Sequence, residues 1–327
     1  MAALLGAAAT LVAALHGGPQ MLYALFFGVS LNHLGRGGRM AAGAEFGART
    51  VLRLGVGLLG ARITAAQIVA LGWQTAAVVV LAVLSTLALA LWLGRRLGLP
   101  RAHSVLAGGA VAICGASAAL AIAAVLPRHK DSERVTLVVV VGVTLLSTIA
   151  MVLYPLLVRV LGLPPALGGL FLGATIHDVA QVVGAGYTLN PATGDAATVV
   201  KLFRVTLLVV VVAGAAWAFR SERVAAAPLA QDGTGAQTPS DKTALLPWFL
   251  WLFMAMVLLN STLGLAPAVQ QALGQVSRAC LVVAIAALGM KTSFRQLARM
   301  GWRPVTLILV ETLWLALFVG VAVLVLR

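Results

Sequence analysis

Long apolar runs separated by short polar turns make up most of the chain. Residues 75–94 and 135–158 contain no charged side chain. Each run is long enough to cross a bilayer, because a helix that spans the hydrocarbon core needs about 20 mostly apolar residues. Further apolar runs lie at residues 1–14, 21–34, 51–63, 103–126, 166–186, 199–219, 246–262, 279–290 and 304–326. The pattern predicts an all-α polytopic membrane protein with about nine to eleven transmembrane segments.

The composition excludes a soluble domain. Apolar residues make up 61% of the chain and charged residues 10%, and the mean hydropathy is +1.03. Soluble domains carry about 25% charged residues. Only residues 220–244 form a long polar stretch, rich in Ala, Gly, Ser, Thr and Asp. We therefore predict a single integral membrane domain over residues 1–327, with residues 220–244 as a cytoplasmic linker between its two parts.

The formal net charge of +14 does not indicate a nucleic-acid partner, because the basic residues are scattered in short turns between apolar runs. This is the positive-inside bias of membrane proteins. With the N-terminus in the cytoplasm and runs 103–126 and 166–186 both re-entrant, most cations lie on the cytoplasmic side. The remainder are Arg62, Arg159, Lys201, Arg204, Arg278 and Arg327. The bias is weaker if run 103–126 spans, so topology and orientation are coupled.

A polar motif interrupts the apolar run at residues 173–186. His177, Asp178 and Gln181 lie within five residues, with glycines on both sides. Ionisable groups at membrane depth cost roughly 2.5–3.5 kcal/mol on insertion scales and persist mainly where they face a cavity or a partner. The motif predicts a discontinuous helix that holds a substrate or ion. The alternative is a set of polar contacts that only join helices.

A second glycine-interrupted stretch, residues 109–117, contains Cys114, Gly115 and Ser117. Like the first motif, it follows a proline turn and precedes a valine-rich run. We read both as discontinuous elements and leave open whether they are re-entrant hairpins or broken spanning helices.

An internal repeat supports this architecture. Leu59-Gly60-Ala61-Arg62, followed by Gly72-Trp73, matches Leu288-Gly289-Met290-Lys291, followed by Gly301-Trp302. An odd number of crossings between the copies predicts that the second copy is inverted. Inverted repeats are typical of secondary transporters, whose sites lie at the repeat interface near the midplane.

Two cations at the start of run 199–219 are candidate anion ligands. Lys201 and Arg204 are three positions apart, so they share a helix face. Arginine forms bidentate hydrogen bonds with oxyanions, and lysine supplies a point charge. Ser117 and backbone N–H groups near Gly115 could complete the site at a helix N-terminus. The alternative is that both cations extend to the membrane interface.

Asp178 and Glu311 are the two carboxylates of nine that fall within apolar runs, which suits coupling to protons or sodium. Glu311 could instead form a structural ion pair with a basic residue, since its counterpart in the repeat is the apolar Ala82. The other carboxylates are predicted to lie in loops: Glu45, Asp131, Glu133, Asp195, Glu222, Asp232 and Asp241.

Enzyme signatures are absent from the sequence. It contains no HExxH, GxSxG or Walker motif and no metal-ligand spacing of histidines. Cys114 and Cys280 fall in apolar runs without a paired spacing, which is typical of small hydrophobic residues. We therefore expect no enzyme activity, no cofactor and no metal.

Four ordered motifs carry a family resemblance: residues 112–118, residues 176–186, Val200-Lys201-Leu202-Phe203-Arg204-Val205, and Leu288-Gly289-Met290-Lys291 with Gly301-Trp302. The chain resembles the YeiH-type membrane proteins, also called the sulfate exporter family, from about residue 22 to its end. Phe203 departs from that pattern, where a small polar residue is more usual. The resemblance implies a bacterial inner-membrane secondary transporter, similar in fold to cation/proton antiporters, with a moving core and a scaffold.

The leading hypothesis is therefore a secondary active transporter that exports sulfate or a related small sulfur-containing anion, coupled to protons or sodium. Its candidate substrate ligands are His177, Asp178, Gln181, Lys201, Arg204, Cys114, Gly115 and Ser117, and its candidate coupling-ion groups are Asp178 and Glu311. The first alternative is a cation/proton antiporter that uses Asp178. The second is a membrane-embedded enzyme or receptor. The sequence leaves the oligomeric state open, and a homodimer is compatible with it.

Overall fold

The computed structural model describes residues 1–16, 20–31, 38–127, 132–220, 248–291 and 302–327. The predicted linker, except Arg220, lies outside the described residues, as does the second repeat copy from Thr292 to Gly301.

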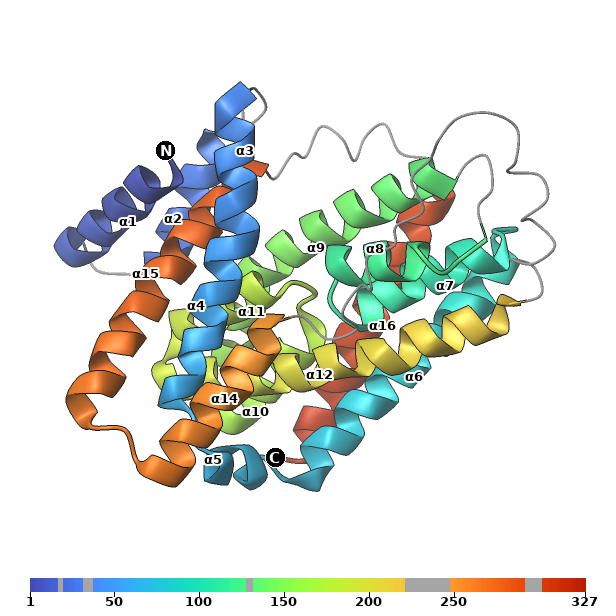
Figure 1. The fold of residues 1–327 in the computed structure, drawn as a ribbon. Helices are drawn as coiled ribbons and strands as arrows, with labels where there is room; N and C mark the ends of the chain where they lie inside the picture. The colour runs from blue at the N-terminus through green and yellow to red at the C-terminus, as the bar shows by residue number, and fades with distance from the viewer. Residues whose placement is uncertain (17–19, 32–37, 128–131, 221–247, 292–301) are drawn as a thin grey trace.

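Within the described ranges the chain forms helices and no strands (Figure 1). The helices run in the order α1 (Ala2–His16), α2 (Gln20–Ser30), α3 (Gly38–Phe46), η2 (Gly47–Val51), α4 (Leu52–Leu59), η3 (Gly60–Arg62), α5 (Ala65–Ala70), α6 (Gly72–Arg96), α7 (Arg101–Ala112), α8 (Ala116–Ala123), α9 (Ser132–Val160), α10 (Pro165–Thr175), α11 (Val179–Leu189), α12 (Pro191–Ala218), α14 (Trp248–Leu263), α15 (Pro267–Lys291) and α16 (Trp302–Val325).

Five described helices, α6, α9, α12, α15 and α16, are long and apolar enough to cross a membrane. Shorter apolar helices accompany them, among them α1, α2, α10 and α11. The structure therefore confirms the predicted all-α polytopic membrane protein. Three loop predictions within the described ranges are wrong: Glu45 lies in α3, Glu133 in α9 and Asp195 in α12. Helix α12 begins directly after its Asn190 cap and therefore includes Asp195.

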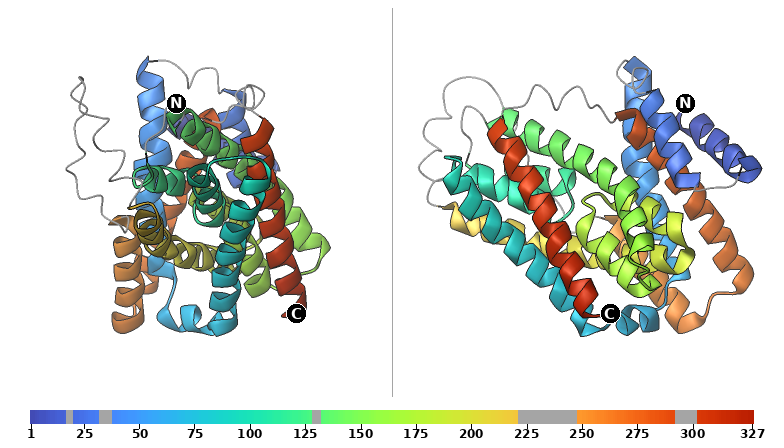
Figure 2. Two further views of the ribbon diagram at one scale, coloured as in Figure 1. Left: turned by 90° about the vertical axis from the view of Figure 1, so that its right-hand side faces the viewer. Right: turned by 180° about the vertical axis from the view of Figure 1, so that it is seen from behind.

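The helices form two groups (Figures 1 and 2). In the first, which we call the flank bundle, α15 packs on α1, α2 and α4, and α14 packs on α4. In the second, the core bundle, α12 packs on α10 and α11, while α16 contacts α6, α7, α9 and α10. Seen from behind, α16 crosses the core bundle diagonally (Figure 2). Helix α11 contacts both α2 and α15, so it joins the two bundles.

Glycines allow the closest helix contacts of the flank bundle. An ideal Cβ at Gly289 of α15 would lie 2.5 Å from the carbonyl oxygen of Leu25 and 2.9 Å from the Cα of Gly28, both on α2. Real Cβ atoms do not approach so closely. Small residues at helix interfaces let backbones touch, and van der Waals packing then replaces the hydrophobic force that is missing in lipid.

Both glycine-interrupted stretches fold back on themselves, which decides between the two alternatives that the sequence left open. In hairpin 1, α7 ends at Ala112, residues 113–115 form the tip, and α8 returns, so that Gly109 contacts Ile122. Gly115 has a φ of +65°, a conformation that glycine adopts without steric cost.

In hairpin 2, α10 and α11 flank a tip formed by residues 176–178. Gly169 near the start of α10 and Gly186 near the end of α11 both pack against the first turns of α12. The outer ends of the two helices therefore lie together, and the tip is inserted part of the way along α12. Irregular backbone at membrane depth is tolerated in this way because protein surrounds it.

Candidate functional site

The tips of the two hairpins meet beside α12. An ideal Cβ at Gly115 would lie 3.3 Å from the Cβ of His177, so the breaks at Cys114 and at His177 are adjacent, as their matching positions in the two elements predict. Each tip leaves backbone groups without helical partners, because the last carbonyls of a helix have no N–H to accept from.

Lys201 and Arg204 of α12 satisfy these carbonyls. The ammonium of Lys201 donates to the carbonyl oxygens of Ile113 at 2.7 Å and Ile176 at 3.0 Å. Arg204 donates to Val111, to Ala112 and, at 3.2 Å, to Ile176. Their exposed fractions are 0% and 1%. Two buried cations therefore face the negative ends of the α7 and α10 dipoles and hold the tips together.

This geometry limits how these cations could act on an anion. A lysine ammonium has three donors and a guanidinium five, so each side chain keeps N–H groups beyond those bound to backbone. Neither Lys201 nor Arg204 lines the cavity described next. Their predicted role as direct anion ligands stays a prediction.

A cavity of about 170 Å³ lies on the other side of the tips, between the two bundles. We call it the hairpin cavity. Helices α8 and α11 both begin at residues that line it, so the positive ends of two helix dipoles are directed at it. The residues that line it are Ala48, Arg49, Leu52, Arg53, Val56, Cys114, Ala116, Ser117, Thr144, Asp178, Val179, Val205, Leu208, Phe249 and Leu288.

Among the predicted site residues, Cys114, Ser117 and Asp178 line the hairpin cavity. Asp178 is the N-cap of α11, and its carboxylate accepts from the N–H of Ala180 at 2.8 Å. Its own backbone N–H donates to the hydroxyl of Ser147 at 3.0 Å. The structure thus places one carboxylate at a helix N-terminus and at the cavity wall. Cys114 and Cys280 are both free thiols.

His177 and Gln181 point away from that cavity, into the core bundle. His177 Nε2 lies 3.1 Å from the hydroxyl oxygen of Thr312, and Gln181 donates to the hydroxyl of Thr148 at 2.8 Å. Both side chains are fully buried. Glu311 follows the same pattern: it has an exposed fraction of 0%, and neither carboxylate oxygen has a hydrogen-bond partner among the described residues. These three groups are therefore separate from the residues that line the hairpin cavity.

The sequence reasoning missed two arginines of the flank bundle, Arg49 and Arg53, which line the hairpin cavity. It counted them only as cytoplasmic charges. Their i, i+4 spacing next to an apolar run was the available signal, since it places both on one helix face.

Glu45 pairs with two of the nearby cations. It forms salt bridges with Arg49 and with Lys291. Partial burial raises the pKa of Glu45, but Lys291 and Arg49 lower that pKa by more, so it lies below its ordinary value. Arg49 of the cavity wall is thus part of a network of three charged side chains.

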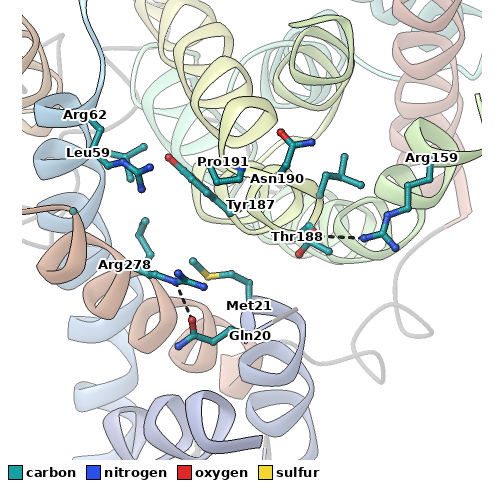
Figure 3. A pocket seen from close by; sticks show the side chains of 13 residues that line it. Gln20, Met21, Leu59, Arg62, Arg159, Tyr187, Thr188, Asn190, Pro191 and Arg278 are labelled. Carbon is teal, nitrogen blue, oxygen red and sulfur yellow. Dashed lines mark hydrogen bonds between the residues drawn. The ribbon is translucent and has the colours of Figure 1, made fainter. Parts of the chain in front are cut away.

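A second cavity, of about 410 Å³, lies elsewhere between the bundles (Figure 3). Arg62 and Arg278 project into it from the flank bundle, and Arg159 from the core bundle. We call it the arginine cavity. Arg278 donates to Gln20 at 3.0 Å, and Arg159 donates to the carbonyl of Thr188 at 3.3 Å. The other lining residues are Met21, Leu59, Tyr187, Leu189, Asn190, Pro191, Gly274 and Leu281.

Two hairpins that meet inside a polytopic helical protein, with cavities on the boundary of two bundles, suggest a membrane transporter. No group of three or more His, Cys, Asp and Glu side chains within the described ranges could hold a metal ion.

The chain belongs to the family described as "Conserved hypothetical protein 698", whose family model matches residues 1–308. This confirms the family resemblance that the sequence motifs carry. The chain is 48% identical to UPF0324 membrane protein TauZ of Paracoccus denitrificans, over 98% of this chain and 92% of the relative. It is 46% identical to UPF0324 membrane protein CT0845 of Chlorobaculum tepidum, over 96% and 85%. No solved structure shows a significant match. The relatives are membrane proteins by name, which agrees with the predicted membrane location.

Proposed function

We propose that this chain is a secondary active transporter that exports a small sulfur-containing oxyanion, with sulfate as the simplest example, across the bacterial inner membrane. One observation carries the proposal. The hairpin cavity combines two helix N-termini with Arg49 and Arg53 of the opposite bundle. Helix N-termini and guanidinium groups both favour oxyanions.

The position of this cavity supports transport rather than static binding. Its walls come from both bundles, so a relative movement of the bundles would change access to it. Transporters built on discontinuous helices bind substrate at such a boundary. The choice of a sulfur-containing anion and the outward direction rest on the family resemblance.

Asp178 supplies a reason for proton coupling. An ionised carboxylate on the same cavity wall repels an anion, so anion binding favours the protonated form of Asp178. The two ligands would then bind cooperatively. The direction of net flux depends on the gradients, and an inside-negative potential favours anion efflux by about 2.3 kcal/mol per charge per 100 mV.

A second candidate function is cation/proton antiport at Asp178. Two observations favour it. Lys201 and Arg204 donate to backbone carbonyls, and Asp178 is the one carboxylate among the described residues that line the hairpin cavity. Anion export instead requires the arginines of that wall to act on substrate, so Arg49 and Arg53 separate the two hypotheses.

Labelled sulfate flux in proteoliposomes tests the proposal. The double variant Arg49→Gln/Arg53→Gln should lower the initial rate about tenfold or more, because two charge-assisted contacts are lost. Arg95→Gln is the matched control, since Arg95 is exposed at the end of α6. Cation flux that fails in Asp178→Asn, with no sulfate flux, would favour the antiporter. The absence of both fluxes would favour a membrane enzyme or receptor.

A further inference from the structure

We infer that the arginine cavity is a second oxyanion site, and that it corresponds to the hairpin cavity through the inverted repeat. This rests on the proposed function for the choice of ligand class, but on independent residues for the site. The ligand chemistry is that of a free oxyanion such as sulfate or of a phospholipid phosphate, and we expect the free anion.

The first argument is a longer repeat than the motif alone indicates. The spacing that pairs Arg62 with Lys291 also pairs Arg49 with Arg278, Leu52 with Leu281 and Leu59 with Leu288. All eight residues belong to two stretches: residues 49–62, which include α4, and residues 278–291, which form the C-terminal half of α15. These two helices pack side by side and run in opposite directions (Figure 1).

The second argument is that paired residues line the two cavities crosswise. The arginine cavity takes Leu59 and Arg62 from the first copy and Arg278 and Leu281 from the second. The hairpin cavity takes the opposite members: Arg49 and Leu52 from the first copy and Leu288 from the second. Lys291 joins it through Glu45, which also binds Arg49. A two-fold rotation that exchanges the copies would exchange the two cavities.

Helix packing follows the same relation. An ideal Cβ at Gly60 would collide with the carbonyl of Phe253 on α14, and one at its partner Gly289 with the carbonyl of Leu25 on α2. Each of the two paired glycines thus lies in close contact with a neighbouring helix. The correspondence therefore extends beyond the side chains of the cavities.

One difference between the cavities predicts where the anion binds more firmly. The counterpart of Glu45 at the same spacing is Gly274. At Gly274 there is no carboxylate, and an ideal Cβ would lie 3.2 Å from the Cδ of Arg62. No salt bridge to Arg62 or Arg278 occurs in the described part of the chain. Asp195, which accepts from Tyr187, lines a neighbouring pocket together with Arg62 and Arg278. It compensates their charge without a salt bridge, whereas Glu45 contacts Arg49 directly.

The geometry suits a small oxyanion that is held from both bundles. Arg62 and Arg278 approach from one side and Arg159 from the other, with Asn190 between them (Figure 3). Guanidinium groups bind oxyanions with paired, directional hydrogen bonds. The volume of about 410 Å³ falls within the roughly 300–1,000 Å³ of ordinary ligand sites. Because a bound anion would contact both bundles, its affinity would depend on their relative position.

The test measures sulfate binding to the purified full chain in a neutral detergent without lipid, by isothermal titration with sodium sulfate. Arg62→Gln/Arg278→Gln should weaken the tighter sulfate binding about tenfold or more, whereas binding at the hairpin cavity should remain. Gly274→Glu should weaken it as well, because it restores the counterpart of Glu45 beside Arg62, whereas Gly274→Gln of equal size should not. Arg327→Gln is the control for a distant cation, which binds the carbonyl of Leu161.

The outcomes separate the possible occupants. Wild-type affinity in the double variant and in Gly274→Glu would overturn the inference, as would the absence of sulfate binding by the wild type. Retained anionic phospholipid that sulfate does not displace would also overturn it, because the occupant would then be a lipid phosphate. Sulfate flux in proteoliposomes is measured in parallel. Loss of the tighter binding in the variants, without any wild-type flux, would refute the proposed function and leave this site standing.

Discussion

Replacing Arg204 with methionine tests whether the two buried cations hold the hairpin tips. Methionine retains an unbranched apolar side chain in place of the arginine stem, although it is shorter, and it removes every donor. Three hydrogen bonds disappear, and the carbonyls of Val111 and Ala112 lose the donor seen in the structure, while Ile176 keeps Lys201. The same substitution at Lys201 removes two hydrogen bonds and leaves Ile113 without that donor.

The expected magnitudes follow from these contacts. A hydrogen bond to a charged group contributes about 1.5–3 kcal/mol, and an orphaned buried carbonyl costs about 1–3 kcal/mol. Removing a buried cation offsets part of this loss of stability, because the desolvation of the cation on folding costs several kcal/mol. We therefore expect Arg204→Met to lower the free energy of unfolding by about 3–5 kcal/mol and Lys201→Met by about 1–3 kcal/mol. The order of the two variants is the sharper prediction.

Intrinsic tryptophan fluorescence during thermal unfolding in detergent provides the assay, since the chain has seven tryptophans. Arg95→Met controls for the loss of an exposed arginine. Repeating the scans with sodium sulfate separates stability from anion binding. If Arg204→Met unfolds at the temperature of Arg95→Met, or if Lys201→Met is the less stable of the two buried variants, the cations do not hold the tips as described.

Three further predictions concern the hairpin cavity and the flank bundle. Asp178→Asn should abolish the pH dependence of anion flux yet cost less than about 1 kcal/mol of stability, because asparagine caps helices as well as aspartate; unchanged pH profiles would exclude Asp178 as the coupling group. Glu45→Gln should lower the unfolding temperature at pH 7 and match the wild type in acid. The pKa of Glu45 is lowered from 4.5 in the folded chain, so its contribution is present above pH 4.5 and is lost as the pH falls through the folded value; a difference that persists at pH 2 would contradict this. Gly289→Leu should lower the free energy of unfolding by about 2 kcal/mol or more, because the larger side chain separates α15 from α2. Gly43→Leu is the control, since an added Cβ there meets no atom within 4 Å. Equal unfolding temperatures of the two variants would refute the close packing.

Much of the fold was predictable because lipid imposes strong rules on a sequence. Every backbone group at membrane depth needs a partner, so long apolar runs must be helices. Gly115 beside Cys114 marked one break, since its positive φ suits glycine. The polar residues His177 and Asp178 marked the other, where the backbone is extended and contains no glycine. The choice between hairpin and broken spanning helix was not predictable. It depends on the packing of Gly169 and Gly186 against α12, which no local pattern encodes.

The sequence indicated residues of the candidate site but not their arrangement. The sequence indicated that Asp178, Lys201 and Arg204 lie at depth, because few ionisable residues interrupt its apolar runs. It could not show that Lys201 and Arg204 face the carbonyl ends of α7 and α10, while Asp178 faces a cavity at the starts of α8 and α11. A hairpin tip presents carbonyls on one side and N–H groups on the other, and only the meeting of two tips decides which side each charge faces.

The sequence by itself determined the membrane class, the family and the two breaks, and it predicts the repeat around Arg62 and Lys291. Apolar length, glycine and charge act locally, and local patterns can be read in one dimension. Only the tertiary structure decided that Arg49 and Arg53 border the hairpin cavity and that Arg62, Arg159 and Arg278 surround another. These groups come from helices far apart in the chain, and what brings them together is the packing of two bundles, which depends on the shapes of whole helix faces rather than on the order of residues.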